Sequence, residues 1–169
     1  MSSNSPLTNA LKNRLDIWTK IGAPEHVIQW ITRGVTIPFT GQYTPSFDID
    51  NRKLTARQAL FVDRELNQLR ASGIISRLDY KPTCVSGINV VDKKGSDKHR
   101  LIIDLRVLNE TCEAPGFTSE DINTVIKLLQ PGDKCVLLDI TKAFHHTPIS
   151  PEDRDYFGFN WKNNLLQME

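Results

Sequence analysis

Gly87-Ile-Asn-Val-Val-Asp92 and Arg100-Leu-Ile-Ile-Asp-Leu105 are two strand-like runs, and Lys93-Lys-Gly-Ser-Asp-Lys98 joins them. The runs are rich in Val, Ile and Leu, which pack well on a pleated surface, whereas the connection is polar and contains a glycine. A β-hairpin is the simplest structure that fits this pattern. Because helical patterns precede and follow the hairpin, the sequence predicts an α/β (α+β) fold.

The predicted hairpin carries a local excess of positive charge. Basic residues at positions 93, 94, 98, 100 and 106 stand against acidic residues at positions 97 and 104, which leaves three positive charges. Two interpretations remain open: an ordinary solvated hairpin, or a flexible flap that closes over a polyphosphate. In the second interpretation, Arg100 supplies a planar set of N–H donors that lysine lacks.

Two short helices are predicted near the amino terminus, after a polar tail over residues 1–10. Apolar residues at helical spacing indicate one helix that Gly22 ends and another from Pro24 to Gly34. Residues 35–39 are expected to be extended, and residues 41–50 to form a connector.

A longer helix is predicted directly before the hairpin. Thr55 is a good N-cap, Gly73 can end the helix, and apolar side chains recur on one face at Ala59, Val62, Leu66 and Leu69. This apolar stripe is typical of an amphipathic helix.

The last third of the chain predicts a helix, a buried strand and a second hairpin. The helix runs from Ser119 as N-cap to Leu129, and the strand covers residues 134–140, where Cys-Val-Leu-Leu precedes a single carboxylate. A short helical turn over residues 141–146 comes next. The hairpin is expected from large residues that alternate over 156–161, followed by a turn.

Composition excludes several classes of protein. Lys and Arg total 21 and Asp and Glu total 20, so the net charge of +1 requires any nucleic-acid-binding surface to be local. The three cysteines suggest neither a disulfide framework nor a zinc site. No run approaches the ~20 apolar residues of a membrane span. We expect an intracellular protein without a membrane partner, in either the cytoplasm or the nucleus.

Asp139 is the first candidate for chemistry. A carboxylate in an apolar strand needs a partner or a metal ion if it is buried. A structural role, such as capping the turn at Thr141, is the alternative. One carboxylate is not a complete phosphoryl-transfer site, because such sites combine several carboxylates with substrate phosphates around Mg²⁺.

Four blocks in order resemble the amino-terminal half of a reverse transcriptase. They are Glu65-Leu-x-x-Leu-x-x-x-Gly-Ile-Ile75, Val91-Asp-Lys-Lys-Gly95, Arg100-Leu-Ile-Ile-Asp-Leu-Arg-x-Leu-Asn109, and Leu138-Asp-Ile-x-x-Ala-Phe-His-His146 with Phe157-Gly-Phe-x-Trp161. The resemblance spans about residues 52–161, and four blocks together are far more specific than any one of them. It is closest in character to retroelements of the long-terminal-repeat or tyrosine-recombinase class.

This resemblance implies a right-hand polymerase architecture. Residues 1–50 would form a helical segment and connector, residues 51–130 a fingers lobe, and residues 131–169 the start of a palm. The implied partners are an RNA or DNA template–primer and deoxynucleotides, and the implied cofactor of the complete enzyme is Mg²⁺ or Mn²⁺.

The resemblance also implies a role for each matching residue. The nucleotide-binding set is Lys93, Arg100, Lys142, Ala143 and Phe144, in which Phe144 stacks under the sugar and excludes a 2′-hydroxyl. From the residues alone, Phe144 is equally well interpreted as a core aromatic. Asp139 matches the first metal-binding aspartate of the palm, and the Ile140 carbonyl is a neighbouring metal ligand. The set that braces the fingers and approaches the template is Asp104, Arg106 and Asn109.

The sequence departs from the family pattern at three points. Lys142 stands where many relatives have an acidic residue, so only a backbone contact to the triphosphate carries over there. His145 and His146 suggest a metal pair, but adjacent residues on a short helix point in different directions. No Asp-Asp pair occurs in the chain, although the family places one in a later hairpin. We therefore expect the isolated chain to be inactive as a polymerase and to hold no metal stably.

Two hypotheses about function follow. The chain is either the front part of an RNA-directed DNA polymerase or a non-catalytic module that binds nucleic acid or a protein partner. In both, the strand at residues 134–140 lacks its usual neighbour, so a partner, self-association or the hairpin at residues 156–166 is expected to cover it.

Overall fold

The computed structural model describes residues 9–41, 45–95, 98–113, 116, 121–140 and 142–169. Several sequence predictions fall outside these residues: most of the polar tail, positions 96 and 97 at the hairpin tip, the Ser119 cap and Thr141. The described helices include none that is long and apolar enough to cross a membrane.

The chain contains both helices and strands, which confirms a mixed α/β fold. In chain order they are η2 (Lys12–Arg14), α1 (Leu15–Lys20), α2 (Glu25–Arg33), β1 (Phe47–Asp48), α3 (Ala56–Ala71), β2 (Ile75–Arg77), β3 (Cys84–Ser86), β4 (Ile88–Asp92), β5 (His99–Ile103), α4 (Arg106–Asn109), α5 (Ile122–Leu128), η3 (Ala143–His146), η4 (Arg154–Tyr156), β6 (Gly158–Trp161) and β7 (Asn164–Met168).

Five strands form one mixed sheet in the order β1-β3-β6-β7-β2. The pairs β1–β3 and β3–β6 are parallel, whereas β6–β7 and β2–β7 are antiparallel. The sequence did not predict β1, which lies in the expected connector. The sheet takes strands from all three segments of the expected division at residues 50 and 130, and that division stays a prediction.

The predicted hairpin is present as the two-stranded sheet β4–β5. Val91 faces Arg100 and Asp92 faces His99 across the pair, and the Lys93 N–H donates to the Lys98 carbonyl at 2.8 Å. Gly87 connects β3 to β4. A Cβ atom at Gly87 would lie 2.7 Å from the Asp50 carbonyl oxygen, so this crossing between the two sheets requires the smallest residue.

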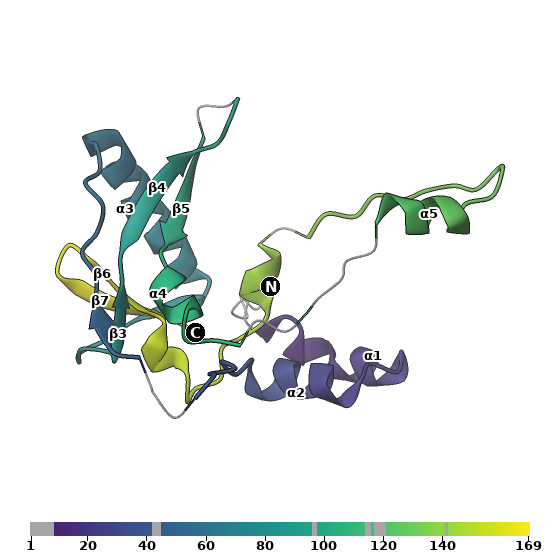
Figure 1. The fold of residues 1–169 in the computed structure, drawn as a ribbon, viewed down its shortest axis with the longest axis horizontal. Helices are drawn as coiled ribbons and strands as arrows, with labels where there is room; N and C mark the ends of the chain where they lie inside the picture. The colour runs from purple at the N-terminus through teal and green to yellow at the C-terminus, as the bar shows by residue number, and fades with distance from the viewer. Residues whose placement is uncertain (1–8, 42–44, 96–97, 114–115, 117–120, 141) are drawn as a thin grey trace, which may run out of the picture.

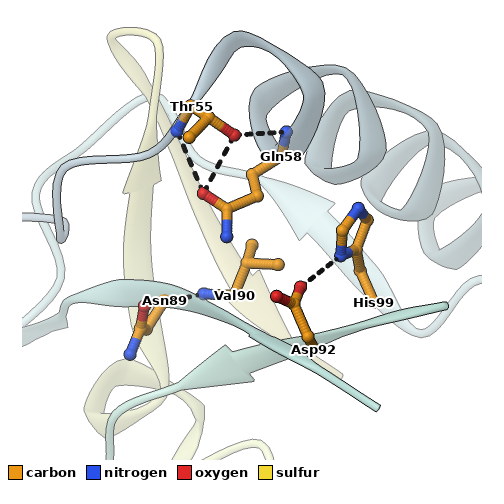
Figure 2. Close-up of polar contacts among 6 residues, drawn as sticks. All are labelled: Thr55, Gln58, Asn89, Val90, Asp92 and His99. Atoms are coloured by element: carbon orange, nitrogen blue, oxygen red, sulfur yellow. Dashed lines mark hydrogen bonds and ion pairs between the residues drawn. The ribbon is translucent and has the colours of Figure 1, made fainter. Parts of the chain in front are cut away.

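Helix α3 packs against the five-stranded sheet and the hairpin (Figure 1). It begins with a capping box: the Thr55 hydroxyl accepts from the Gln58 N–H, and the Gln58 side chain accepts from the Thr55 N–H (Figure 2). Its predicted stripe is largely buried. The core cluster consists of Val62, Leu66, Leu69, Ile74, Ile75, Ile88, Val90, Phe159 and Leu166.

The second hairpin, β6–β7, is also present. Lys162 and Asn163 both have positive φ angles, 48° and 62°, so they form a two-residue turn whose twist matches that of the flanking strands. The predicted helices before residue 34 are present as α1 and α2, and Gly34 at φ 96° is the C-cap of α2. Residues 35–39, expected to be extended, form no named strand and hold two isolated bridges, Val35 to Ile149 and Phe39 to Cys112.

Residues 121–140, called the arm below, project from the body of the molecule (Figure 1). Helix α5 lies in the arm, and Asp121 is its N-cap, with its side chain accepting from the Thr124 N–H. The apolar side chains of the arm are exposed, and Leu137 is 96% exposed.

The predicted buried strand at residues 134–140 is wrong. No described strand lies beside this segment, and a lone strand cannot satisfy its backbone hydrogen bonds. The β6–β7 hairpin, one of the three coverings expected for this segment, pairs instead with β3 and β2. The arm therefore leaves Val136, Leu137 and Leu138 open to solvent.

Candidate functional site

A large hollow lies between α3, the β4–β5 hairpin and the segment that follows the arm. Its volume is about 870 Å³. Among the described residues, four basic side chains line it, from Lys93, Lys98, Arg100 and Lys142, together with the one carboxylate of Glu65. The rest of the lining is mainly apolar and includes Phe61, Leu101, Ile103, Phe157 and Met168. We call this hollow the cationic cavity.

Three of the five predicted nucleotide-binding residues meet in the cationic cavity. Lys93 comes from the end of β4, Arg100 from β5, and Lys142 from the residue before η3. Lys142 has a left-handed backbone, with φ 54° and ψ 41°, which is uncommon for a residue with a side chain. Its Nζ lies 3.6 Å from a Glu65 carboxylate oxygen on α3, so this ion pair joins the two walls of the cavity.

The other two predicted nucleotide-binding residues do not line the cationic cavity. Ala143 and Phe144 lie in η3 and are exposed, and the Phe144 side chain is 93% accessible to solvent. The alternative interpretation of Phe144 as a core aromatic is therefore wrong. Its sugar-stacking role stays a prediction.

Asp139 and Ile140 lie on the exposed arm and do not line the cationic cavity. In the described part of the chain, Asp139 has no ion pair, so it is not locked into an internal salt bridge. A divalent cation requires several oxygen ligands. No group of three or more His, Cys, Asp or Glu side chains that could hold a metal ion occurs among the described residues, His145 and His146 included. The described residues alone do not fit a metal centre.

Two of the three predicted template-side residues, Asp104 and Arg106, line a different hollow, of about 560 Å³. Arg106 binds Asp104 through two hydrogen bonds, with Nε at 2.8 Å and Nη2 at 2.6 Å from its carboxylate oxygens. This guanidinium contact lowers the pKa of Asp104 to about 2, so the carboxylate is ionised at any physiological pH. Asn109 lies at the end of α4, and its side chain does not line this hollow.

Sequence reasoning missed a carboxylate–imidazole pair at the base of the hairpin loop. His99 Nδ1 lies 2.7 Å from Asp92 Oδ1 (Figure 2), and the His99 ring meets Phe61 edge to face with centroids 5.3 Å apart. The His99 Nε2 atom is buried and has no hydrogen-bond partner. Hairpin register could have revealed this pair, because the residues on either side of the connection face one another across the strands.

His145 gives the cationic cavity a pH-sensitive group. Burial lowers the pKa of His145 below its ordinary value of 6.5, and the charge on Lys142 lowers it further, against a smaller opposite effect of Glu65. The folded state therefore favours neutral His145. As pH falls below 6.5, the unfolded chain binds this proton more readily than the folded chain, so the folded state loses stability.

We expect His145→Gln to remove part of the acid sensitivity of folding. Urea unfolding at a series of pH values from 7.5 down to 5 would measure it, as the difference between variant and unaltered chain. In the unaltered chain, stability should fall more steeply below pH 6.5 than in the variant. His26→Gln, on α2 and outside the cavity, is the control. If the free energy of unfolding fell equally with pH in His145→Gln and in the unaltered chain, His145 would not be a source of the acid sensitivity.

No protein-family model matches the chain. Its sequence is 30% identical over 145 residues to the Retrovirus-related Pol polyprotein from transposon gypsy of Drosophila melanogaster. The aligned region covers 76% of this chain and 14% of that protein. It is 34% identical over 73 residues to the Gag-Pol polyprotein of avian reticuloendotheliosis virus, which covers 42% of this chain and 6% of that protein. The chain thus spans a small part of both relatives.

Two solved structures have a similar fold. One is a foamy viral protease–reverse transcriptase in complex with dsDNA, with a TM-score of 0.59 and 18% identity over 78% of this chain and 27% of that one. The other is a mutant of the prototype foamy virus protease–reverse transcriptase, with a TM-score of 0.64 and 16% identity over 94% of this chain and 24% of that one. Together, the sequence and fold similarities support a domain derived from a retroelement pol region.

Proposed function

We propose that the chain is the amino-terminal part of an RNA-directed DNA polymerase, with a fingers lobe and the start of a palm. In this proposal the cationic cavity binds the triphosphate of an incoming deoxynucleotide. The observation that carries it is the meeting of Lys93, Arg100 and Lys142, from separate sequence blocks, around one cavity.

The chemistry of the cavity suits a polyphosphate. Among the described lining residues, four cations against one carboxylate leave a positive surplus, which attracts an anion. Arg100 offers a planar set of donors that can bind two phosphate oxygens at once. In the proposed enzyme, these residues hold the phosphates in position and neutralise charge, which is most of what phosphoryl transfer requires of a protein.

The remaining predicted residues take supporting roles in the proposal. Phe144 contacts the sugar, and Asp104, Arg106 and Asn109 brace the hairpin on the template side. Asp139 contributes one carboxylate to a metal site whose further ligands lie outside the described residues. Because one carboxylate is not a magnesium site, the proposal assigns no metal-dependent step to these residues alone.

The proposed partners are deoxynucleotides and a template–primer. The similar foamy viral structure is of a complex with dsDNA, which supports a nucleic-acid duplex as one partner. The chain spans only 14% of its gypsy relative. We therefore propose polymerase activity for a complete enzyme that contains this chain, and not for the chain alone.

Nucleotide binding by the chain tests the proposal. Isothermal titration with dTTP and with thymidine should show binding that depends on the triphosphate, so that thymidine binds at least about tenfold more weakly. Inorganic tripolyphosphate should compete with dTTP, and added salt should weaken the dTTP complex. Equal affinity for thymidine and dTTP, or failure of tripolyphosphate to compete, would contradict a phosphate-binding cavity.

A non-catalytic binding module is the second candidate function, and the exposed arm favours it. Contiguous exposed apolar side chains are typical of an interaction surface, and Val136, Leu137 and Leu138 form such a run. If this module function is correct, a protein partner or a second copy covers the arm. Partner binding or self-association would then survive loss of Lys93 and Arg100 but not replacement of Leu137 and Leu138 by Asp.

A further inference from the structure

A second, smaller hollow runs along the outer side of α3. Its volume is about 370 Å³, and we call it the α3 groove. Three cations, one carboxylate and two aromatic rings contribute to its lining: Arg57, Arg64, Lys98, Glu65, Phe61 and His99. Positive charge therefore exceeds negative charge in the groove.

The two arginines of the α3 groove have no acidic partner among the residues that the structure describes. Within the described residues, neither Arg57 nor Arg64 makes an ion pair. Arg64 Nε donates to the Leu60 carbonyl at 3.3 Å, which uses one of its five N–H donors. Both side chains therefore keep donors for an anion.

The acidic residues of α3 are held by other partners. Asp63 accepts from Lys162 Nζ at 2.7 Å and from Trp161 Nε1 at 2.8 Å, and these contacts lower its pKa. Asp63 does not line the groove. Glu65 lines it, but its carboxylate pairs with Lys142. The carboxylates of α3 thus offset little of the charge on Arg57 and Arg64.

The α3 groove adjoins the cationic cavity. Phe61, Glu65, Lys98 and His99 line both hollows, so the two share a wall. Arg57 and Arg64 are two helical turns apart, about 10 Å along the axis. The basic side chains therefore form a strip that runs along α3 and turns at Lys98 towards Arg100 and Lys93.

We propose that the α3 groove binds the sugar–phosphate backbone of a single-stranded nucleic acid as that strand passes the cationic cavity. This inference rests on the proposed function and adds a strand-binding surface to it. Cations interleaved with aromatic rings are the pattern that binds single strands, because cations hold the phosphates while rings contact bases. Asp92 holds His99 in one orientation against Phe61, which keeps the rings of the groove fixed.

Fluorescence anisotropy with a labelled single-stranded oligodeoxythymidylate tests this inference. The double variant Arg57→Glu with Arg64→Glu should bind at least about tenfold more weakly, and the slope of log affinity against log salt should lose about 1.4 units, or about 0.7 for each lost phosphate contact. The matched control is Arg70→Glu with Arg77→Glu, which makes the same change in net charge around a different hollow. The control should keep its affinity within about threefold.

Folding and nucleotide binding separate the possible outcomes. A glutamate is favourable in the first turn of a helix, so Arg57→Glu should not unfold α3, and circular dichroism would check this. The groove variant should keep the dTTP affinity of the unaltered chain. Equal loss of oligonucleotide binding in both double variants would contradict strand binding in the α3 groove. Competition by polyglutamate as effective as that by unlabelled oligonucleotide would contradict it as well. Absence of dTTP binding in the unaltered chain would instead contradict the proposed function.

Discussion

Phe159→Ala is expected to lower the free energy of unfolding by about 3–5 kcal/mol. Phe159 lies on β6 in the middle of the five-stranded sheet and is 0% exposed, in contact with the core cluster beneath α3. Truncation removes buried apolar surface and leaves a cavity that the surrounding strands cannot fill. Urea unfolding followed by circular dichroism would measure the change.

Phe144→Ala is the matched control for Phe159→Ala. It removes the same atoms from a side chain that is 93% exposed. Its effect on the free energy of unfolding should stay within about 0.5 kcal/mol. Similar losses for the two variants would mean that Phe144 is buried in solution, which would contradict the exposed position of η3.

Lys93→Ala combined with Arg100→Ala is expected to weaken dTTP binding about 100-fold. Each variant removes a charge-assisted contact to phosphate, and a contact of this kind is worth about tenfold in affinity. Both residues line the cationic cavity, Lys93 from directly after β4 and Arg100 from β5, so neither can replace the other. Isothermal titration would measure the affinities of the single and double variants.

Lys94→Ala combined with Arg77→Ala removes the same charge from outside the cationic cavity. Lys94 is adjacent to Lys93 but does not line the cavity, and Arg77 lies on β2. This control should change dTTP affinity by no more than about threefold. If both double variants lost affinity equally, the effect would come from net charge, and the cationic cavity would not be the binding site.

Local signals explain what the sequence predicted correctly. Thr55 and the stripe through Val62, Leu66 and Leu69 define α3 without reference to the rest of the chain. The β4–β5 hairpin follows from two aliphatic runs around a short polar connection. In both elements the residues that stabilise the structure are close in sequence, so a single sequence is sufficient to identify them.

Features that depend on distant pairing were missed or wrong. Strand β1 has two residues and exists through parallel pairing with β3, which no local pattern indicates. Residues 134–140 have the composition of a buried strand, but a strand requires a neighbour, and no described strand provides one. The exposed position of Asp139 follows from the same missing pairing.

The candidate site was predicted only in part, for a similar reason. The family resemblance identified Lys93, Arg100 and Lys142, and the fold brings these three together. The ion pair between Glu65 and Lys142 connects α3 to the segment after the arm, and residue spacing gives no sign of it. Arg57 and Arg64 were missed because exposed arginines on a helix are ordinary until a neighbouring element closes a groove beside them.

Photocrosslinking with a deoxyadenosine triphosphate that carries an aryl azide on its γ-phosphate tests the central claim most directly, because it locates the bound triphosphate. Mass spectrometry of the digested adduct should find the label on the peptides that contain Lys93, Lys98 and Arg100 or Lys142 and His145, and tripolyphosphate should suppress it. Label confined to the arm, or to the hollow beside Asp104 and Arg106, would contradict nucleotide binding in the cationic cavity.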